Sequence, residues 1–346
     1  MKTMLFKVGL LPNYKHGQTV VTLSLCIGLA TMICSQSILA SLSKNIDGQY
    51  DYNPTTVIFT AEILKLATSL ILLLKEILGE PEEFFTSKWR FFPHNGCGTG
   101  YFLLALLYAI QNNALYFVLI YVDPGTFQIL INLKLPLTAF LLHLLNGKQY
   151  SFQQKTGLVL LTLGATLSGS PSLTTIDQSS KPYGYILMGI IVCISGFAGV
   201  LNEIFLKNQN NGSLPWQNCQ LYAWGCIFCL FKLLQDFNLN FRLFFKGYTW
   251  ITAANVINLS SVGLVTSLLL KYSDNIVRSI SGIISICLSN FISVVLLNVQ
   301  LSNQSMAGLV SVGLGIAFYS EIFNPAHLST YPATRLHRPG SNCAPP

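Results

Sequence analysis

The sequence from Tyr108 to Lys134, YAIQNNALYFVLIYVDPGTFQILINLK, decides how the rest of the chain is interpreted. It contains two apolar segments separated by Asp-Pro-Gly at residues 123–125, a combination typical of turns. The second segment carries Gln128, Asn132 and Lys134 among aliphatic side chains. Polar groups inside a membrane-spanning helix are costly and are commonly functional. The stretch therefore predicts a helical hairpin in a membrane, with its polar residues as candidates for a site.

The composition of the whole chain supports this interpretation. Of the 346 residues, 51% are hydrophobic and 10% are charged, whereas soluble domains have about 25% charged residues. Apolar windows of about 20 residues, the length that crosses a bilayer, recur along the chain. We predict an all-α polytopic membrane protein with ten transmembrane helices, at residues 18–42, 53–78, 99–121, 125–145, 153–171, 182–206, 215–235, 249–271, 275–297 and 302–322.

The chain divides into three parts. We expect an N-terminus at residues 1–17, a ten-helix membrane domain at residues 18–322 and a tail at residues 323–346. The first apolar segment is longer than the apolar region of a signal peptide, so we expect it to remain as the first span. The tail is rich in proline, and we expect it to be disordered.

Lysine and arginine residues are distributed unevenly over the connections between the spans. The side that includes the N-terminus holds most of them. The opposite side holds only Lys44, Lys181, Arg242 and Lys246. The positive-inside rule then places both termini in the cytosol. Three lysines, Lys65, Lys134 and Lys232, fall inside spans.

The two halves of the chain contain a short similar sequence. Tyr121-Val-Asp123-Pro follows the third span, and Tyr272-Ser-Asp274-Asn follows the eighth. With five spans in each half, the halves have opposite orientations in the membrane. This pattern fits two inverted five-helix repeats, an architecture in which transporters form a substrate site near the midplane.

Five groups of residues, in order along residues 18–319, resemble the nucleotide-sugar transporter family, which includes the CMP-sialic acid, UDP-galactose and UDP-N-acetylglucosamine transporters of the Golgi. The groups are Pro54-Thr55-Thr56-Val57 with Glu62 and Lys65; Tyr108, Gln111-Asn112-Asn113, Asp123, Gln128 and Leu133-Lys134; Ser195 to Val200 with Glu203 and Lys207; Asn218 with Gln220; and Lys271 to Asn275. The resemblance implies a fold of the drug/metabolite transporter type in the Golgi membrane. It also implies that a nucleotide sugar enters the lumen in exchange for a nucleoside monophosphate by alternating access.

Two positions depart from the family pattern. Asn132-Leu133-Lys134 stands where the family usually has Gln-Leu-Lys, and Gln217 stands where an arginine is usual. The sequence of residues 123–134 is closer to that of a less characterised branch of probable UDP-sugar transporters. We therefore expect a pyrimidine nucleotide sugar as the substrate, with a UDP-sugar favoured. The alternatives are a carrier of a CMP- or CDP-linked or other phosphorylated metabolite, and a non-transporting membrane adaptor of the same fold.

Buried lysines are the first candidates for binding the phosphate of such a substrate. Lys134 lies too deep in its span to reach the interface by extending along the helix. We expect it to face phosphate, and the alternative is a structural ion pair with Glu62 or Glu203. Lys271 ends the eighth span, so it is either a second phosphate ligand or a lysine at the membrane interface.

The other candidate residues are amides, a tyrosine and a carboxylate. By resemblance, Gln111, Asn112 and Gln128 contact the substrate, although amides also join helices in membranes. Asn218 and Tyr222 are candidates for reading and stacking on the base, and the alternative for Tyr222 is an aromatic anchor at the interface.

Two carboxylates sit one helical turn from a lysine. Glu62 precedes Lys65 and Glu203 precedes Lys207, so each pair shares one helix face. We expect structural pairing in both cases, and Glu62 facing the sugar is the less favoured interpretation.

No pattern in the sequence indicates catalysis or a metal site. The five histidines are far apart, and the Cys226-x-x-Cys229 pair lies in an apolar helix without carboxylate or histidine neighbours. We therefore expect no enzyme activity, no cofactor and no metal. The net charge of +7 fits the topology better than nucleic-acid binding. The expected partners are a nucleotide sugar, a nucleoside monophosphate and the lipid bilayer, with homo-oligomers or complexes with other transporters or glycosyltransferases left open.

Overall fold

The computed structural model describes residues 14–43, 45, 50–79, 97–122, 127, 130–169, 182–208, 212–237, 244–297 and 302–320. Within these residues the chain forms ten helices, and one lies at each of the ten predicted positions. They are α2 (Tyr14–Leu42), α3 (Pro54–Gly79), α6 (Cys97–Tyr121), α8 (Lys134–Asn146), α9 (Phe152–Gly169), α10 (Pro182–Lys207), α11 (Leu214–Phe237), α12 (Trp250–Tyr272), α13 (Asn275–Leu297) and α14 (Asn303–Tyr319). The predicted tail, 323–346, lies outside the described residues.

The helices have the composition of a multi-pass membrane protein. In the described part of the chain, five are long and apolar enough to cross a bilayer: α2, α3, α10, α12 and α13. Large apolar side chains also face outward, including Ile71 on α3, Phe231 on α11 and Phe291 on α13. A lipid environment accepts such side chains, and helices satisfy their own backbone hydrogen bonds there.

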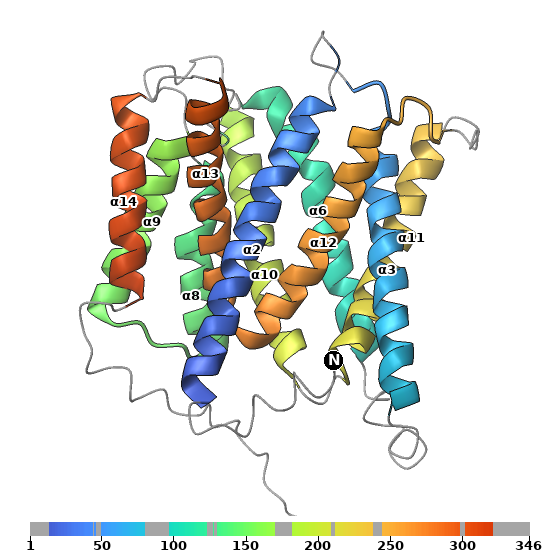
Figure 1. Ribbon diagram of the computed structural model, residues 1–346, viewed down its shortest axis with the longest axis horizontal. Helices are drawn as coiled ribbons and strands as arrows, with labels where there is room; N and C mark the ends of the chain where they lie inside the picture. The colour runs from blue at the N-terminus through green and yellow to red at the C-terminus, as the bar shows by residue number, and fades with distance from the viewer. Residues whose placement is uncertain are drawn as a thin grey trace, which may run out of the picture.

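Figure 1 shows the helices side by side, with successive helices running in opposite directions. We call the end at which α2 begins the lower end, and the end at which α3 and α12 begin the upper end. The chain turns from α8 to α9 and from α12 to α13 at the lower end.

The main helix–helix contacts are preserved when each of the first five helices is exchanged with its counterpart among the second five. Helix α2 packs against α12 and α13, and its counterpart α10 packs against α6 and α8. Helix α3 packs against α12 just as its counterpart α11 packs against α6. The α3–α11 and α9–α14 contacts each join two counterpart helices, so the exchange leaves them unchanged. The most extensive contacts are therefore preserved by this exchange, whereas smaller ones such as α10–α12 and α9–α13 have no counterpart of similar extent among the described helices.

Helix α8 begins later than the predicted span 125–145, and Pro136 explains the difference. Proline has no N–H, and its ring clashes with the carbonyl four residues earlier, which here is Asn132. The Asn132 carbonyl accepts instead from the Leu135 N–H at 3.1 Å, and the Leu130 carbonyl accepts from the Leu133 N–H at 3.1 Å. These bonds span three residues rather than four, so the backbone tightens before α8 starts at Lys134.

A close contact between α9 and α14 anchors one side of the bundle. A Cβ on Gly157 would lie 2.6 Å from the Tyr319 nitrogen, and one on Gly164 would lie 2.7 Å from the Val312 nitrogen. Glycine at these positions lets the two backbones touch. Helices α8, α10 and α13 complete this core through Leu142, whose side chain is fully buried, and its neighbours.

Candidate functional site

A cavity of about 450 Å³ lies on the other side of the bundle, among α2, α3, α6, α10, α11, α12 and α13. Small-molecule sites typically have about 300–1,000 Å³, so this cavity has the volume of a ligand site. Its polar lining residues are Gln36, Thr55, Glu62, Lys65, Tyr108, Asn202, Tyr222, Lys232, Thr266, Ser267 and Arg278.

The lining residues reach the upper end of the bundle and stop short of the lower end. Thr55 is the second residue of α3, at the upper end, whereas Ser267 and Arg278 lie near the lower ends of α12 and α13. Because a helix rises about 1.5 Å per residue, Ser267 and Arg278 lie within about 8 Å of those lower ends. They form the floor of the cavity, and Thr55 lies at its mouth.

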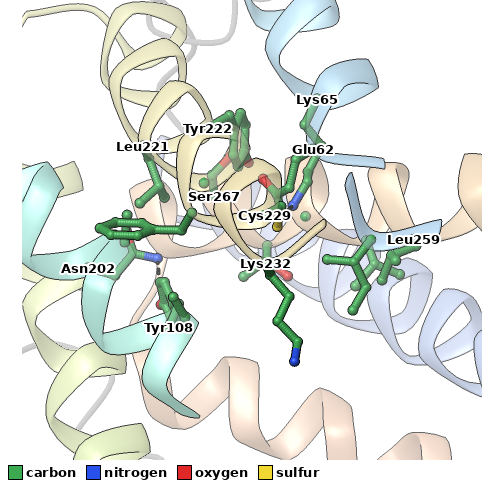
Figure 2. A pocket seen from close by; sticks show the side chains of 18 of the residues that line it. Glu62, Lys65, Tyr108, Asn202, Leu221, Tyr222, Cys229, Lys232, Leu259 and Ser267 are labelled. Atoms are coloured by element: carbon green, nitrogen blue, oxygen red, sulfur yellow. Dashed lines mark hydrogen bonds and ion pairs between the residues drawn. The ribbon is translucent and has the colours of Figure 1, made fainter. Parts of the chain in front are cut away.

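A partly buried ion pair lines the middle of the cavity. The Lys65 ammonium pairs with the Glu62 carboxylate one turn earlier on α3, as the sequence predicted (Figure 2). The same ammonium lies 4.8 Å from the centroid of the Tyr222 ring. A Cβ on Gly225 would lie 2.9 Å from Glu62 Oε2, and one on Gly263 would lie 2.5 Å from Lys65 Cδ. These two glycines therefore provide the space that the ion pair occupies.

Two amide groups near the floor each leave an oxygen without a partner. Asn202 Nδ2 donates to the Tyr108 hydroxyl at 3.2 Å (Figure 2), and Asn218 Nδ2 donates to Ser267 Oγ at 2.9 Å. Within the described residues, Asn202 Oδ1 and Asn218 Oδ1 are buried and accept no hydrogen bond. Because buried polar atoms are normally paired, these oxygens are available to a ligand that donates N–H or O–H groups.

The floor also carries positive charge. Arg278 lines the cavity and donates to Asn275 Oδ1 at 3.3 Å. Lys134 is the first residue of α8, and it lies near enough to Arg278 for their charges to repel. The ion pairs between described residues are Lys65–Glu62, Lys148–Asp274, Lys207–Glu203 and Lys232–Asp236. Neither Lys134 nor Arg278 belongs to one, so these cations suit an anionic ligand.

A polar network lies below the floor. Lys148, between α8 and α9, pairs with Asp274, between α12 and α13. The Glu203 carboxylate accepts from Lys207 at 2.7 Å and from the Asn275 N–H at 2.7 Å. Burial alone would raise the pKa of Asp274, but the Lys148 charge, the hydrogen bonds from Lys148 and the Val277 N–H, and the Lys207 charge together hold that pKa below its ordinary value. These contacts hold the lower end of the bundle together.

The structure brings some of the predicted site residues together. Glu62 and Tyr222 line the cavity, and Asn218 adjoins it through Ser267. Tyr222 is 5% exposed, so its alternative role as an interfacial anchor is wrong. Glu62 and Glu203 pair with other lysines, so the predicted alternative of an ion pair between Lys134 and either carboxylate is also wrong.

Other predicted residues lie elsewhere. Lys271 does not line the cavity, and its ammonium donates to the Leu206 carbonyl at 2.8 Å near the lower end. Gln111 is on α6 but is not a lining residue, and its Oε1 is buried without a partner among the described residues. Lys134 is not a lining residue, although it lies close enough to Arg278 for their charges to interact. Gln128 and the side chain of Asn112 lie outside the described residues.

Sequence reasoning did not identify Arg278, Asn202 or Ser267 as candidates. Arg278 follows Asp274 by one helical turn, and Asn202 directly precedes Glu203. A search of the residues flanking each motif, one turn along the same helix, would have found them. Lys232 was recognised only as a lysine within a span.

Gln217, one of the two departures from the family pattern, has a structural role. Its side chain is fully buried, and Nε2 donates to the Gly212 carbonyl at 3.0 Å and the Asn208 carbonyl at 3.4 Å. It therefore fixes the connection between α10 and α11, and it does not line the cavity. This departure does not remove a cavity residue.

The comparisons with known proteins agree with these features. The family model described as "Nucleotide-sugar transporter" matches residues 18–320. CMP-sialic acid transporter 1 of Oryza sativa subsp. japonica is 36% identical over 302 residues, covering 84% of this chain and 91% of the relative. CMP-sialic acid transporter 1 of Arabidopsis thaliana is 33% identical over 313 residues, covering 86% and 88%. A solved crystal structure is similar in fold, with a TM-score of 0.59, 14% identity and coverage of 87% of this chain and 97% of its own.

Proposed function

Because the chain belongs to the nucleotide-sugar transporter family, whose members are transporters rather than enzymes, we propose that it exchanges a pyrimidine nucleotide sugar for a nucleoside monophosphate across a membrane. The observation that carries this proposal is the cavity floor. Arg278 and its neighbour Lys134 provide positive charge without a carboxylate partner among the described residues. Asn202 and Asn218 provide free acceptor oxygens beside them.

The substrate groups have complementary positions in this arrangement. The phosphate lies at Arg278, whose planar guanidinium suits phosphate oxygens. The base lies between the Asn202 and Asn218 amides and beside Tyr222, and the sugar extends toward the Glu62–Lys65 pair and the mouth. The half-helix α8 begins at Lys134, and such helix starts in broken spans point positive dipole ends at anionic substrates in other transporters.

The identity of the base follows less directly. The sequence motif at residues 123–134 favours a UDP-sugar, whereas the relatives with the printed names above are CMP-sialic acid transporters. Cytosine offers the two N–H bonds of its amino group to the acceptor oxygens of Asn202 and Asn218, whereas uracil offers the single N–H at N3. We therefore propose a pyrimidine nucleotide sugar as the class and treat CMP- and UDP-linked sugars as the compounds to compare.

We further propose that transport proceeds by alternating access between two inverted repeats in the Golgi membrane, with both termini cytosolic. The exchange symmetry of the helix contacts supports the repeats. In the predicted topology the mouth near Thr55 faces the lumen and the network around Asp274 closes the cytosolic side. An empty site leaves two cations unpaired in a region of low dielectric, which disfavours return of the empty carrier and favours exchange.

The test is exchange in proteoliposomes preloaded with CMP or UMP and offered labelled CMP- and UDP-sugars. We expect exchange by the wild-type protein, and its loss in Arg278→Gln and Lys134→Ala. Lys155→Ala removes an exposed lysine outside the cavity and is the matched control. Folded protein that exchanges none of these nucleotides would favour the adaptor alternative. Robust net uptake into empty liposomes would contradict obligatory exchange.

A further inference from the structure

Lys232 extends the cavity lining toward the upper end of α11. It lies ten residues after Tyr222 on the same helix, about 15 Å along the axis. Tyr222, Gly225, Cys229 and Lys232 all line the cavity, so they share one helix face. Figure 2 shows the Lys232 side chain extending away from Glu62 and Lys65. The ammonium therefore stands at the mouth, separate from the charges in the middle and on the floor.

The ionic partner of Lys232 is held mainly by α3. The Asp236 carboxylate accepts from the Thr55 hydroxyl at 2.9 Å and from Asn53 Nδ2 at 3.4 Å, whereas Lys232 Nζ lies 3.5 Å away. Charge-assisted hydrogen bonds are normally about 2.7–2.9 Å long. A partly exposed ion pair of this length contributes about 0–1 kcal/mol. The Lys232 ammonium can thus turn toward a ligand at little cost.

The other charges of the lining have partners or are assigned to the phosphate. Lys65 is neutralised by Glu62, and Arg278 lies at the floor. A nucleotide seated on the floor directs its sugar toward the mouth. We propose that Lys232 binds a carboxylate on that sugar, so that the carrier prefers acidic nucleotide sugars over their neutral counterparts. This inference rests on the proposed function, and it assigns a specificity role to a residue outside the family motifs.

The Asp236 carboxylate has the same negative charge as the proposed carboxylate of the ligand, so it repels that ligand and competes with it for Lys232. Removing the Asp236 charge frees Lys232 and removes a repulsion, so the two substitutions have opposite expected effects. Lys232→Gln lowers the preference for acidic sugars, and Asp236→Asn raises it. Lys232→Arg keeps the charge and preserves the preference.

The experiment measures competition against labelled exchange with two ligand pairs, in each of which one member has a carboxylate on the sugar and the other a neutral group in its place. They are UDP-glucuronic acid against UDP-glucose, and CMP-sialic acid against its methyl ester. A charged hydrogen bond contributes about 1.5–3 kcal/mol, so we expect a preference for the acid of about 10- to 100-fold. Lys232→Gln should abolish this preference while affinity for the neutral ligand stays constant. Lys246→Gln, an exposed lysine of the upper end outside the lining, is the control.

The outcomes separate the inference from the function on which it rests. If nucleotide exchange persists and the acid-to-neutral ratio is equal in wild type and Lys232→Gln, the inference is wrong and the proposed function stands. If Lys232→Gln weakens both ligands equally, Lys232 does not read the carboxylate. If no nucleotide is exchanged and none raises the Tm of the wild-type protein, both proposals fail.

Discussion

The Lys65 ammonium lies 4.8 Å from the centroid of the Tyr222 ring while it pairs with Glu62 on its own helix. A cation over an aromatic ring contributes about 0.5–2 kcal/mol, more when it is shielded from water. The Lys65 ammonium thus covers the face of the Tyr222 ring on which a base would stack. A short movement of α3 or of the Lys65 side chain would uncover that face. Base stacking and the position of the Glu62–Lys65 pair are therefore coupled.

Adding a methyl group at Gly263 tests this coupling. The new Cβ would lie 2.5 Å from Lys65 Cδ, so Gly263→Ala should displace the lysine and lower the exchange rate about tenfold or more. Gly28→Ala on α2 and Gly282→Ala on α13 meet no atom within 4 Å and should leave exchange unchanged. The measurement is initial exchange rate at equal reconstituted protein. Equal rates for Gly263→Ala and the two controls would contradict the coupling.

Replacing Arg278 should change the affinity for phosphate more than the affinity for the nucleoside. The guanidinium lines the floor without a carboxylate partner among the described residues. Arg278→Gln should weaken the binding of CMP or UMP by about 1.5–3 kcal/mol. Cytidine and uridine should be little affected, and Arg278→Lys should retain part of the preference. Ligand-induced shifts in Tm across a concentration series give the affinities, and an equal loss for nucleoside and nucleotide would place the phosphate elsewhere.

Gln217 should matter for stability rather than for binding. Gln217→Ala leaves the Gly212 and Asn208 carbonyls without their donor and should cost about 1–3 kcal/mol. Gln217→Arg retains N–H donors and should retain more of the stability. Unfolding of the detergent-solubilised protein provides the first measurement, and ligand affinity at a temperature where both variants are folded provides the second. A loss of affinity with unchanged Tm would show that Gln217 contacts substrate.

The Lys148–Asp274 pair should make the stability of the folded protein depend on pH in the acidic range. Because the pKa of Asp274 is lowered in the folded protein, its contribution is complete above the ordinary value of about 4 and is lost as the pH falls through the lowered value. Asp274→Asn keeps an oxygen for the Ile276 and Val277 N–H groups and removes the charge and the acceptor oxygen that face Lys148. The Tm difference between wild type and this variant should be constant from pH 7 to 5 and shrink below pH 4. A difference that grows in acid would contradict this assignment.

The positions of the helices were predictable because each depends on a long local pattern of apolar residues. Every predicted span contains a helix, and the pairing of Glu62 with Lys65 and of Glu203 with Lys207 followed from their spacing on one helix face. The start of α8 was not predicted, although Pro136 is visible in the sequence, because the apolar pattern continues through it.

The composition of the cavity was less predictable because it depends on how separate helices rotate against one another. Tyr222 and Glu62 were expected at the site and line it, whereas Lys271 ends a span nearby and bonds a backbone carbonyl instead. Arg278 joins the site only because of the way α13 packs against α2 and α10. Such tertiary orientation is absent from any single helical pattern.

The break before α8 has a mechanical consequence. Pro136 has no N–H to donate to the Asn132 carbonyl, which accepts from the Leu135 N–H of α8 instead, so fewer backbone hydrogen bonds than in a continuous helix resist tilting of the chain before Leu133. Helix α8 itself is fixed in the core by Leu142 and its neighbours. Lys134 is the first residue on the fixed side of this joint. Its charge, near that of Arg278, is therefore held in place by the α8 core, and a tilt of the preceding residues leaves it unmoved.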